Sequence, residues 1–211
     1  MGAGADVVGF VASIGEPVGL VAPSGGAISV LGAAARSTAV SAVAVYEPIA
    51  FEVLGEEEGA GFQAAFARMG ELAGEGRLAA AARAMMGFLA DDEEMASLEA
   101  LGHFEAAGPY VPTLLEQVQQ LTQSDEPSPT DPSELAKISA PVLILHGSQS
   151  TRRWFNDGVR HVAEHIADSE VREIPGAGHH AVWVEPKPVA DELIRFFAAR
   201  PAGVRAGRRG E

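Results

Sequence analysis

The fold is decided by one stretch of the sequence, VGLVAPSGGAISVLGAAA at residues 18–35. A short apolar run ends there in a turn of small residues, and a helix-like pattern follows from Ala27 to Arg36. A serine on so sharp a strand-to-helix turn holds its hydroxyl above the edge of a sheet, and the positions two before and two after it must be small. Ala22 and Gly26 meet that demand around Ser24. Ser24 is therefore a candidate nucleophile, although an ordinary glycine-rich turn with an incidental serine fits this stretch equally well.

Three further strands are expected, and helical patterns separate them. Val40–Tyr46 is the first, and Val142–Leu145 is apolar throughout, as a strand buried on both faces should be. Glu170–Ile174 carries charges that suit an exposed sheet edge. Apolar residues at helical spacing occupy 159–166 and 189–197. Strands that alternate with helices predict a parallel α/β sheet.

The middle of the chain has a different pattern. Three amphipathic stripes, beginning at Phe62, Leu78 and Val111, each mark a helix, and no strand pattern interrupts them. The proline-rich stretch SDEPSPTDPS at 124–133 then leads back to the α/β pattern. We therefore expect a core in two parts, at residues 1–51 and 136–199. A helical lid at 52–135 lies between them, and a disordered tail follows at 200–211.

Charge and composition narrow the function classes. The 211 residues include no cysteine, which excludes disulfides, thiolate metal sites and a cysteine nucleophile. The net charge of −14 argues against nucleic acid, because binding a phosphate backbone needs a basic surface. Residues 52–135 hold 17 acidic and three basic residues, and solvated helix faces explain this excess more simply than a functional acidic patch. Without a basic n-region or a continuous apolar span, we expect a cytoplasmic protein that does not enter membranes.

A histidine pair follows the last predicted strand, in Gly176-Ala177-Gly178-His179-His180. The carboxyl ends of parallel strands share one edge of the sheet, so His179 can reach Ser24 and act as its general base. A loop histidine taken alone is usually ordinary polar surface. The serine on the same edge is what favours a catalytic role.

Four segments, in order, resemble the α/β-hydrolase superfamily: VGLVAPSGGAISVLGAAA, AVAVYEPIAF, APVLILHGS and IPGAGHHAVW. They look like its nucleophile elbow, the strand after it, the strand before the usual acid loop, and the histidine loop. The resemblance implies Ser24 as nucleophile, His179 as base and the Gly25 N–H as an oxyanion donor. It also implies hydrolysis of a small ester-like or related acyl substrate through a covalent acyl-enzyme, with no cofactor. Members of the superfamily also hydrolyse C–C bonds, so the reaction type is less fixed than the fold.

The acid of the expected triad has two candidates. Many members of the family place an aspartate in the loop that here reads His146-Gly147-Ser148-Gln149-Ser150, and Ser150 cannot hold an imidazolium. A minority carry the acid one strand earlier, where Glu47 stands, so Glu47 is the first choice and Asp157 the second. A strand-end glutamate with no catalytic role explains Glu47 about as well.

The sequence departs from the family at its start, since only one helix precedes the elbow. Several strands of the family's sheet are then missing, including the one whose loop gives the second oxyanion N–H. Val18–Val21 would be an unpaired apolar edge, which favours self-association. The expected fold is therefore an N-terminally shortened α/β-hydrolase sheet, and a catalytically impaired remnant or interaction protein is the alternative function.

One competing motif belongs to another class of enzyme. His161-Val162-Ala163-Glu164-His165 fits H-x-x-E-H, a zinc pattern of some proteases. The apolar face of this helix lies well around from His161, so the two histidines are expected to face water. A catalytic zinc also needs a third ligand and a cleft, which makes a zinc peptidase a distant third hypothesis.

Overall fold

A four-stranded parallel sheet forms the centre of the computed structural model, which describes residues 4–200. Its strands lie side by side in chain order: β1 (Val18–Pro23), β2 (Val40–Tyr46), β3 (Val142–Gly147) and β4 (Ser169–Ile174). Every neighbouring pair is parallel. All four carboxyl ends therefore meet at one edge, as the alternating pattern of the sequence predicted.

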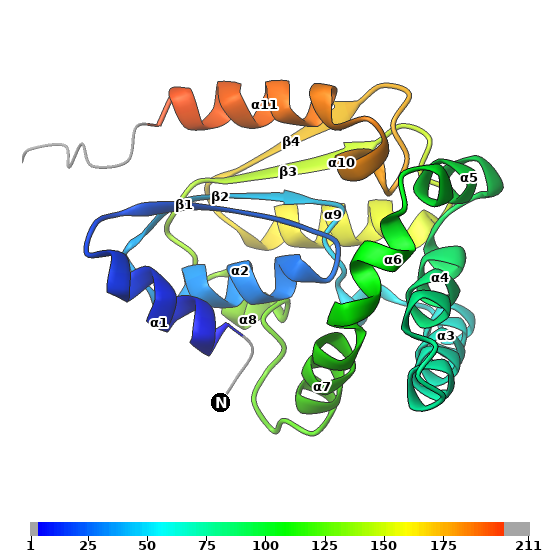
Figure 1. The fold of residues 1–211 in the computed structure, drawn as a ribbon. Helices are drawn as coiled ribbons and strands as arrows, with labels where there is room; N and C mark the ends of the chain where they lie inside the picture. The colour runs from blue at the N-terminus through cyan, green and yellow to red at the C-terminus, as the bar shows by residue number, and fades with distance from the viewer. Residues whose placement is uncertain (1–3, 201–211) are drawn as a thin grey trace, which may run out of the picture.

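Helices cover both faces of this sheet (Figure 1). One face carries α1 (Ala5–Ile14), α2 (Gly26–Arg36), α8 (Pro132–Leu135) and α9 (Arg153–His165). The other carries α10 (Ala181–Val184) and α11 (Pro186–Ala198). Strand β2 shows why two layers form, because Val43 and Val45 pack into the first core while Ala42, Ala44 and Tyr46 pack into the second. A strand with apolar residues on both faces must be covered on both.

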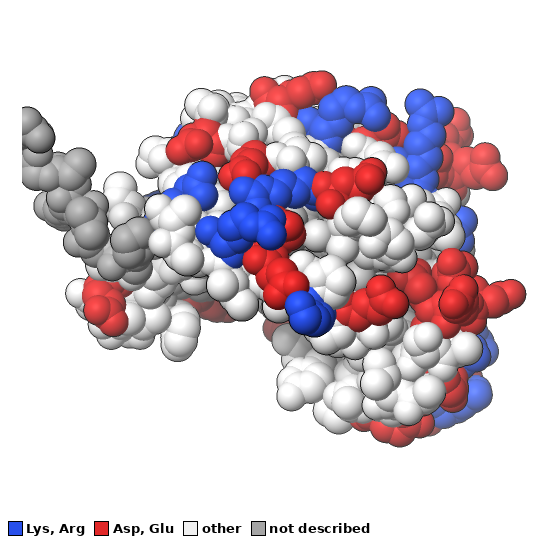
Figure 2. Space-filling view, turned by 90° about the horizontal axis from the view of Figure 1, so that it is seen from above, with Lys and Arg blue, Asp and Glu red and all other residues white. Residues whose placement is uncertain are grey.

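The chain between β2 and α8 is helical throughout its ordered elements. It comprises η1 (Phe51–Val53), α3 (Glu56–Gly74), α4 (Leu78–Leu89), α5 (Asp92–Ala100), α6 (His103–Ala107), η2 (Gly108–Tyr110) and α7 (Val111–Thr122). We call these elements the helical insertion. They enclose an apolar cluster of their own, and Trp154 and Phe155 of α9 join it from the core. The acidic residues expected here gather on the insertion's side of the molecule, at the right of Figure 2.

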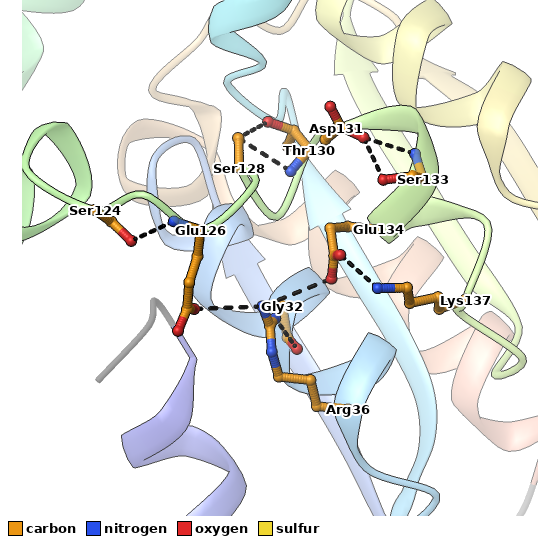
Figure 3. A network of polar contacts seen from close by, with 10 residues as sticks. All are labelled: Gly32, Arg36, Ser124, Glu126, Ser128, Thr130, Asp131, Ser133, Glu134 and Lys137. Atoms are coloured by element: carbon orange, nitrogen blue, oxygen red, sulfur yellow. Dashed lines mark hydrogen bonds and ion pairs between the residues drawn. The ribbon is translucent and has the colours of Figure 1, made fainter.

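The polar linker that leaves the insertion is tied to the core by ion pairs (Figure 3). Arg36, at the end of α2, lies 3.9 Å from the Glu126 carboxylate and 3.6 Å from that of Glu134. Glu134 is buried, and Lys137 pairs with its second oxygen. Two cations compensate this buried carboxylate, so the linker is fixed where it rejoins the sheet.

The tail was predicted to begin at Arg200, and that boundary is wrong. The Arg200 guanidinium carbon lies 4.2 Å from the centre of the Phe196 ring, and its Nη2 lies 3.5 Å from the Glu170 carboxylate. These contacts hold Arg200 against α11 and β4. The rest of the predicted tail, 201–211, lies outside the described residues. Within the described chain, no helix has both the length and the apolar character needed to cross a bilayer.

Candidate active site

Ser24 stands on a tight turn between β1 and α2. Its φ of 51° lies in the left-handed region, which a residue with a side chain adopts at a cost. Its N–H donates to the Tyr46 carbonyl at 2.7 Å, so the turn begins as a continuation of the sheet. A Cβ added at Gly26 would lie 3.3 Å from the Cβ of Ala22. The small residues on either side of Ser24 therefore fit the close approach that such a turn requires.

Ser24, His179 and Glu47 form one hydrogen-bonded chain at the carboxyl edge of the sheet. The Ser24 Oγ lies 3.0 Å from His179 Nε2, and His179 Nδ1 lies 2.7 Å from Glu47 Oε2. Because a carboxylate only accepts, Nδ1 carries the proton of the neutral ring and Nε2 is free to accept the serine proton. His179 and Glu47 are 1% and 0% exposed, so this contact is shielded from water.

The Glu47 carboxylate is held by more than the histidine. Its Oε1 accepts hydrogen bonds from the Gly147 N–H at 2.8 Å and from the Ser150 hydroxyl. Buried polar atoms need hydrogen-bond partners, and these bonds supply them for this carboxylate. Glu47 also has a positive φ, 44°, and among residues 4–200 it shares that property with one other non-glycine residue, Ser24. Strained backbone at two residues of one constellation is typical of functional sites.

Two residues that sequence reasoning missed position the imidazole. The Phe155 ring of α9 stacks on the His179 ring with centroids 3.8 Å apart and planes 15° apart. The Tyr46 hydroxyl donates to the Gly178 carbonyl at 2.6 Å, directly before the histidine. Burial, together with the nearby Glu47 and Glu94 carboxylates, raises the pKa of Tyr46, so its hydroxyl stays a donor. An aromatic residue in an amphipathic helix is usually a core residue, so the sequence did not predict a role for Phe155 in the site.

The oxyanion donor expected from the sequence lies at the start of a helix. Gly25 is the N-cap of α2, is exposed and directly follows Ser24. A helix N-terminus favours negative charge. In the described part of the chain no strand pairs with the outer edge of β1, and so no neighbouring strand there supplies a second N–H.

A cavity of about 600 Å³ lies between α2, the insertion and the linker. Its walls are mostly apolar and include Ile28, Phe51, Phe62, Phe66 and Leu121. Ile28 lies in the first turn of α2, four residues after Ser24, so the cavity reaches the end of the helix that Ser24 precedes. Arg36 and Glu126, seen in Figure 3, line it as well.

The remaining candidate residues are not brought to this site. Asp157 lies on α9 between Arg153 and Arg160, at 3.6 and 3.2 Å, and makes no hydrogen bond to His179. His161 and His165 are half-buried, so the expectation that they face water is wrong. His161 Nε2 lies 2.8 Å from the Thr130 carbonyl, because the linker covers this part of α9. Over residues 4–200 no group of three metal-ligating side chains is found.

The comparison with known families agrees with this fold. A family model described as the alpha/beta hydrolase family matches residues 3–192. The chain therefore belongs to the α/β-hydrolase family. None of the curated proteins matches it.

Several solved structures share the fold at low sequence identity. An alpha/beta hydrolase from Sphaerobacter thermophilus DSM 20745 is 22% identical, with a TM-score of 0.63, over 91% of this chain and 72% of its own. The esterase RhEst1 from Rhodococcus sp. ECU1013 is also 22% identical, with a TM-score of 0.66, over 92% and 70%. The 2-hydroxy-6-oxo-6-phenylhexa-2,4-dienoate hydrolase of Rhodococcus sp. strain RHA1 is 20% identical, with a TM-score of 0.63, over 91% and 68%.

Proposed function

We propose that this protein is a serine hydrolase that cleaves a small ester-like substrate through a covalent acyl-enzyme. The observation that carries the proposal is the hydrogen-bonded chain from Ser24 through His179 to Glu47. A hydroxyl, an imidazole and a carboxylate in this order are the parts of an activated serine. Family membership supports hydrolysis in general, and the geometry of these three side chains supports the serine mechanism.

The chemistry follows from the positions of the three groups. His179 Nε2 takes the Ser24 proton while Oγ forms a bond to the substrate carbonyl carbon, and the Gly25 N–H faces the developing oxyanion. His179 then returns the proton to the leaving alkoxide, which departs as an alcohol and leaves an ester on Ser24. Water repeats the sequence, with its proton passing through His179, and releases the carboxylic acid. Glu47 keeps the Nδ1 proton in place and stabilises the imidazolium in both halves.

The cavity beside α2 fits an apolar part of such a substrate. Its aromatic and aliphatic walls come from both the core and the insertion, so the insertion acts as a lid over bound substrate. Because the cavity reaches the first turn of α2 and Ser24 itself does not line it, we expect a longer acyl group to enter it and a short one not to. We therefore expect the highest kcat/KM for substrates with an extended apolar group.

The competing function is a remnant that keeps the elbow but turns over no substrate. It is favoured by the outer edge of β1, where no described strand contributes a second oxyanion donor. Losing one such donor lowers rates by on the order of 100- to 1,000-fold. That loss is large but leaves a measurable rate above the uncatalysed reaction. A measurement of the hydrolysis rate therefore distinguishes the enzyme from the remnant.

Steady-state hydrolysis of p-nitrophenyl acetate and p-nitrophenyl octanoate tests the proposal, with Ser24→Ala and His179→Ala as matched variants. The proposal expects turnover by the wild type and a fall to near background in both variants. Equal rates in wild type and Ser24→Ala, with all proteins folded by circular dichroism, would support the remnant instead.

We also propose that two copies of this chain associate through β1. The outer edge of this strand carries no charge from Val18 to Gly26, whereas the opposite edge strand, β4, carries Glu170 and Arg172. Charged side chains protect an edge strand from pairing, and their absence leaves it open. Each copy then has one open edge, so pairing stops at a dimer.

A further inference from the structure

One residue of the insertion contacts the loop that carries the histidine. Glu94 lies in the first turn of α5, and its Oε1 accepts a hydrogen bond from the His180 N–H at 2.7 Å. Asp91 fixes this turn, because its side chain accepts from the Glu94 N–H at 2.8 Å. The contact therefore joins a well-defined helix start to the residue next to His179.

The loop is shaped to admit this carboxylate. A Cβ added at Gly178 would overlap Glu94 Oε1, and the three atoms nearest to it all belong to the Glu94 carboxylate. Three consecutive residues of the loop are thus held from three directions. Tyr46 bonds the carbonyl of Gly178, Glu47 bonds the ring of His179, and Glu94 bonds the N–H of His180.

The His180 ring makes no hydrogen bond to Glu94. It is 1% exposed, and neither of its nitrogens has a hydrogen-bond partner within the described residues. Burial, with His179 and His103 nearby, lowers the pKa of this ring to about 3, so it stays neutral. Only the main chain of His180 uses the carboxylate.

The charge of Glu94 acts on the neighbouring imidazole as well. Burial raises the pKa of Glu94, the His180 N–H and the charge of His179 lower it, and the Asp91 and Glu47 carboxylates raise it. The interaction with His179 is reciprocal, so an ionised Glu94 favours the protonated imidazole that forms during catalysis. The other titratable groups near Glu94 and His179 are Tyr46, His103 and His180.

We propose that Glu94 is a positioning residue of the active site, holding the histidine loop from the insertion and supplying a second negative charge to the imidazolium of His179. This inference rests on the proposed serine mechanism. It makes the position of His179 depend on the placement of the insertion, because α5 carries the carboxylate.

Two variants of Glu94 separate its hydrogen bond from its charge. Glu94→Gln keeps an oxygen that accepts from the His180 N–H, and Glu94→Ala removes both functions. Glu93→Ala is the matched control, because Glu93 is the preceding residue of the same helix turn and is exposed. The rate of labelling by a fluorophosphonate is measured from pH 5 to 9, together with kcat and KM for p-nitrophenyl acetate.

The expected results differ between the variants. Glu94→Ala lowers the labelling rate and kcat by roughly 10- to 100-fold with little change in KM, since a misplaced histidine affects the chemical step. Glu94→Gln recovers most of that rate, and its acidic limb moves to lower pH because the imidazolium has lost a nearby carboxylate. Glu93→Ala behaves as the wild type. Wild-type rates in Glu94→Ala, or an unshifted acidic limb in Glu94→Gln, overturn the inference.

Gly178→Ala gives an independent approach to the same contact. Its methyl group displaces the Glu94 carboxylate, so the wild-type background should lose rate as Glu94→Ala does. In the Glu94→Ala background the same change meets no carboxylate and should have no further effect. Additive losses would contradict the inference.

A third measurement keeps the inference separate from the proposed function. Hydrogen-exchange protection of the His180 N–H, which donates to Glu94, is measured by NMR in folded wild type, Glu94→Ala and Glu93→Ala, and needs no turnover. Protection lost in Glu94→Ala alone supports the contact even where no serine labelling is seen. Unchanged protection in an active enzyme leaves the serine mechanism standing and removes the role of Glu94.

Discussion

Ser150 donates a hydrogen bond to Glu47 across the carboxyl edge of the sheet. Ser150 stands in the loop after β3, where the family resemblance led us to look for the acid, and Glu47 stands at the end of β2. The two positions therefore meet at one point from neighbouring strands. A carboxylate placed on either strand could face His179, and in this chain β2 carries it while β3 supplies a donor to it.

Replacing Glu47 by glutamine should lower kcat by on the order of 1,000- to 10,000-fold. The amide keeps the shape, but it can donate to Nδ1 and so stabilise the wrong tautomer of His179. The measurement is steady-state ester hydrolysis, and Asp157→Asn is the control because Asp157 lies among arginines of α9. A large loss in Asp157→Asn, with Glu47→Gln near wild type, would assign the acid to the other carboxylate.

Filling the cavity should change substrate preference without disturbing the serine. Gly59 lines the cavity, and a Cβ added there has no heavy atom within 4 Å. Gly59→Leu should therefore fold, and should lower kcat/KM for the octanoate ester by about tenfold or more, consistent with a lost apolar contact. The acetate ester should be unaffected.

Gly74→Leu is the matched control for the cavity, since Gly74 also lies on α3 with open space around it and does not line the cavity. If Gly59→Leu slows both esters equally, or neither, the cavity does not hold the acyl group.

Acid should destabilise the protein through His180. Its pKa is lowered from 6.5 to about 3 by burial and by the neighbouring His179 and His103. Between those two pH values the unfolded chain binds a proton that the folded chain does not, so the free energy of unfolding falls as the pH falls. His180→Phe should make that decline less steep by up to about 1.4 kcal/mol per pH unit.

Urea unfolding at several pH values measures this slope, and His165→Phe is the control from the half-buried pair on α9. The carboxylates near His180, Glu94 among them, titrate in both proteins and cancel in the comparison. Equal slopes for wild type and His180→Phe would mean that His180 does not titrate as its burial implies.

The open edge of β1 should give a dimer that a single charge disrupts. Val21 is 53% exposed on β1, and Val171 is 44% exposed on β4. Light scattering after gel filtration should show a dimer for the wild type and for Val171→Lys, and a monomer for Val21→Lys. A wild-type monomer, or a dimer that resists Val21→Lys and yields to Val171→Lys, is inconsistent with association through β1.

Much of the fold follows from local patterns, and the rest depends on contacts between distant residues. Strands β1, β2 and β3 were predicted because each is a short apolar run, and β4 because its charged residues suit the edge of a sheet. The structure extends β1 and β3 by two residues each, to Pro23 and Gly147. The short helices α5 and α6 were missed because α5 is rich in acidic residues and α6 spans only five residues.

The site residues also fall into two groups, those that a local pattern predicts and those that depend on contacts between distant residues. Ser24 and His179 carry local motifs, and Glu47 could be named from the strand it ends. Phe155, Tyr46 and Glu94 contact the histidine loop only through the tertiary fold, and nothing in their local sequence marks them. The half-buried state of His161 was missed for a related reason, since the linker residue that covers it, Thr130, is distant in sequence.

The central claim is that Ser24 is an activated nucleophile, and covalent labelling tests it most directly. The folded protein is treated with a fluorophosphonate, and the modified residue is located by peptide mass spectrometry in wild type, Ser24→Ala and His179→Ala. We predict a single modification on Ser24, absent in Ser24→Ala and much slower in His179→Ala. No labelling of folded wild type, or labelling that persists in Ser24→Ala, would contradict the claim.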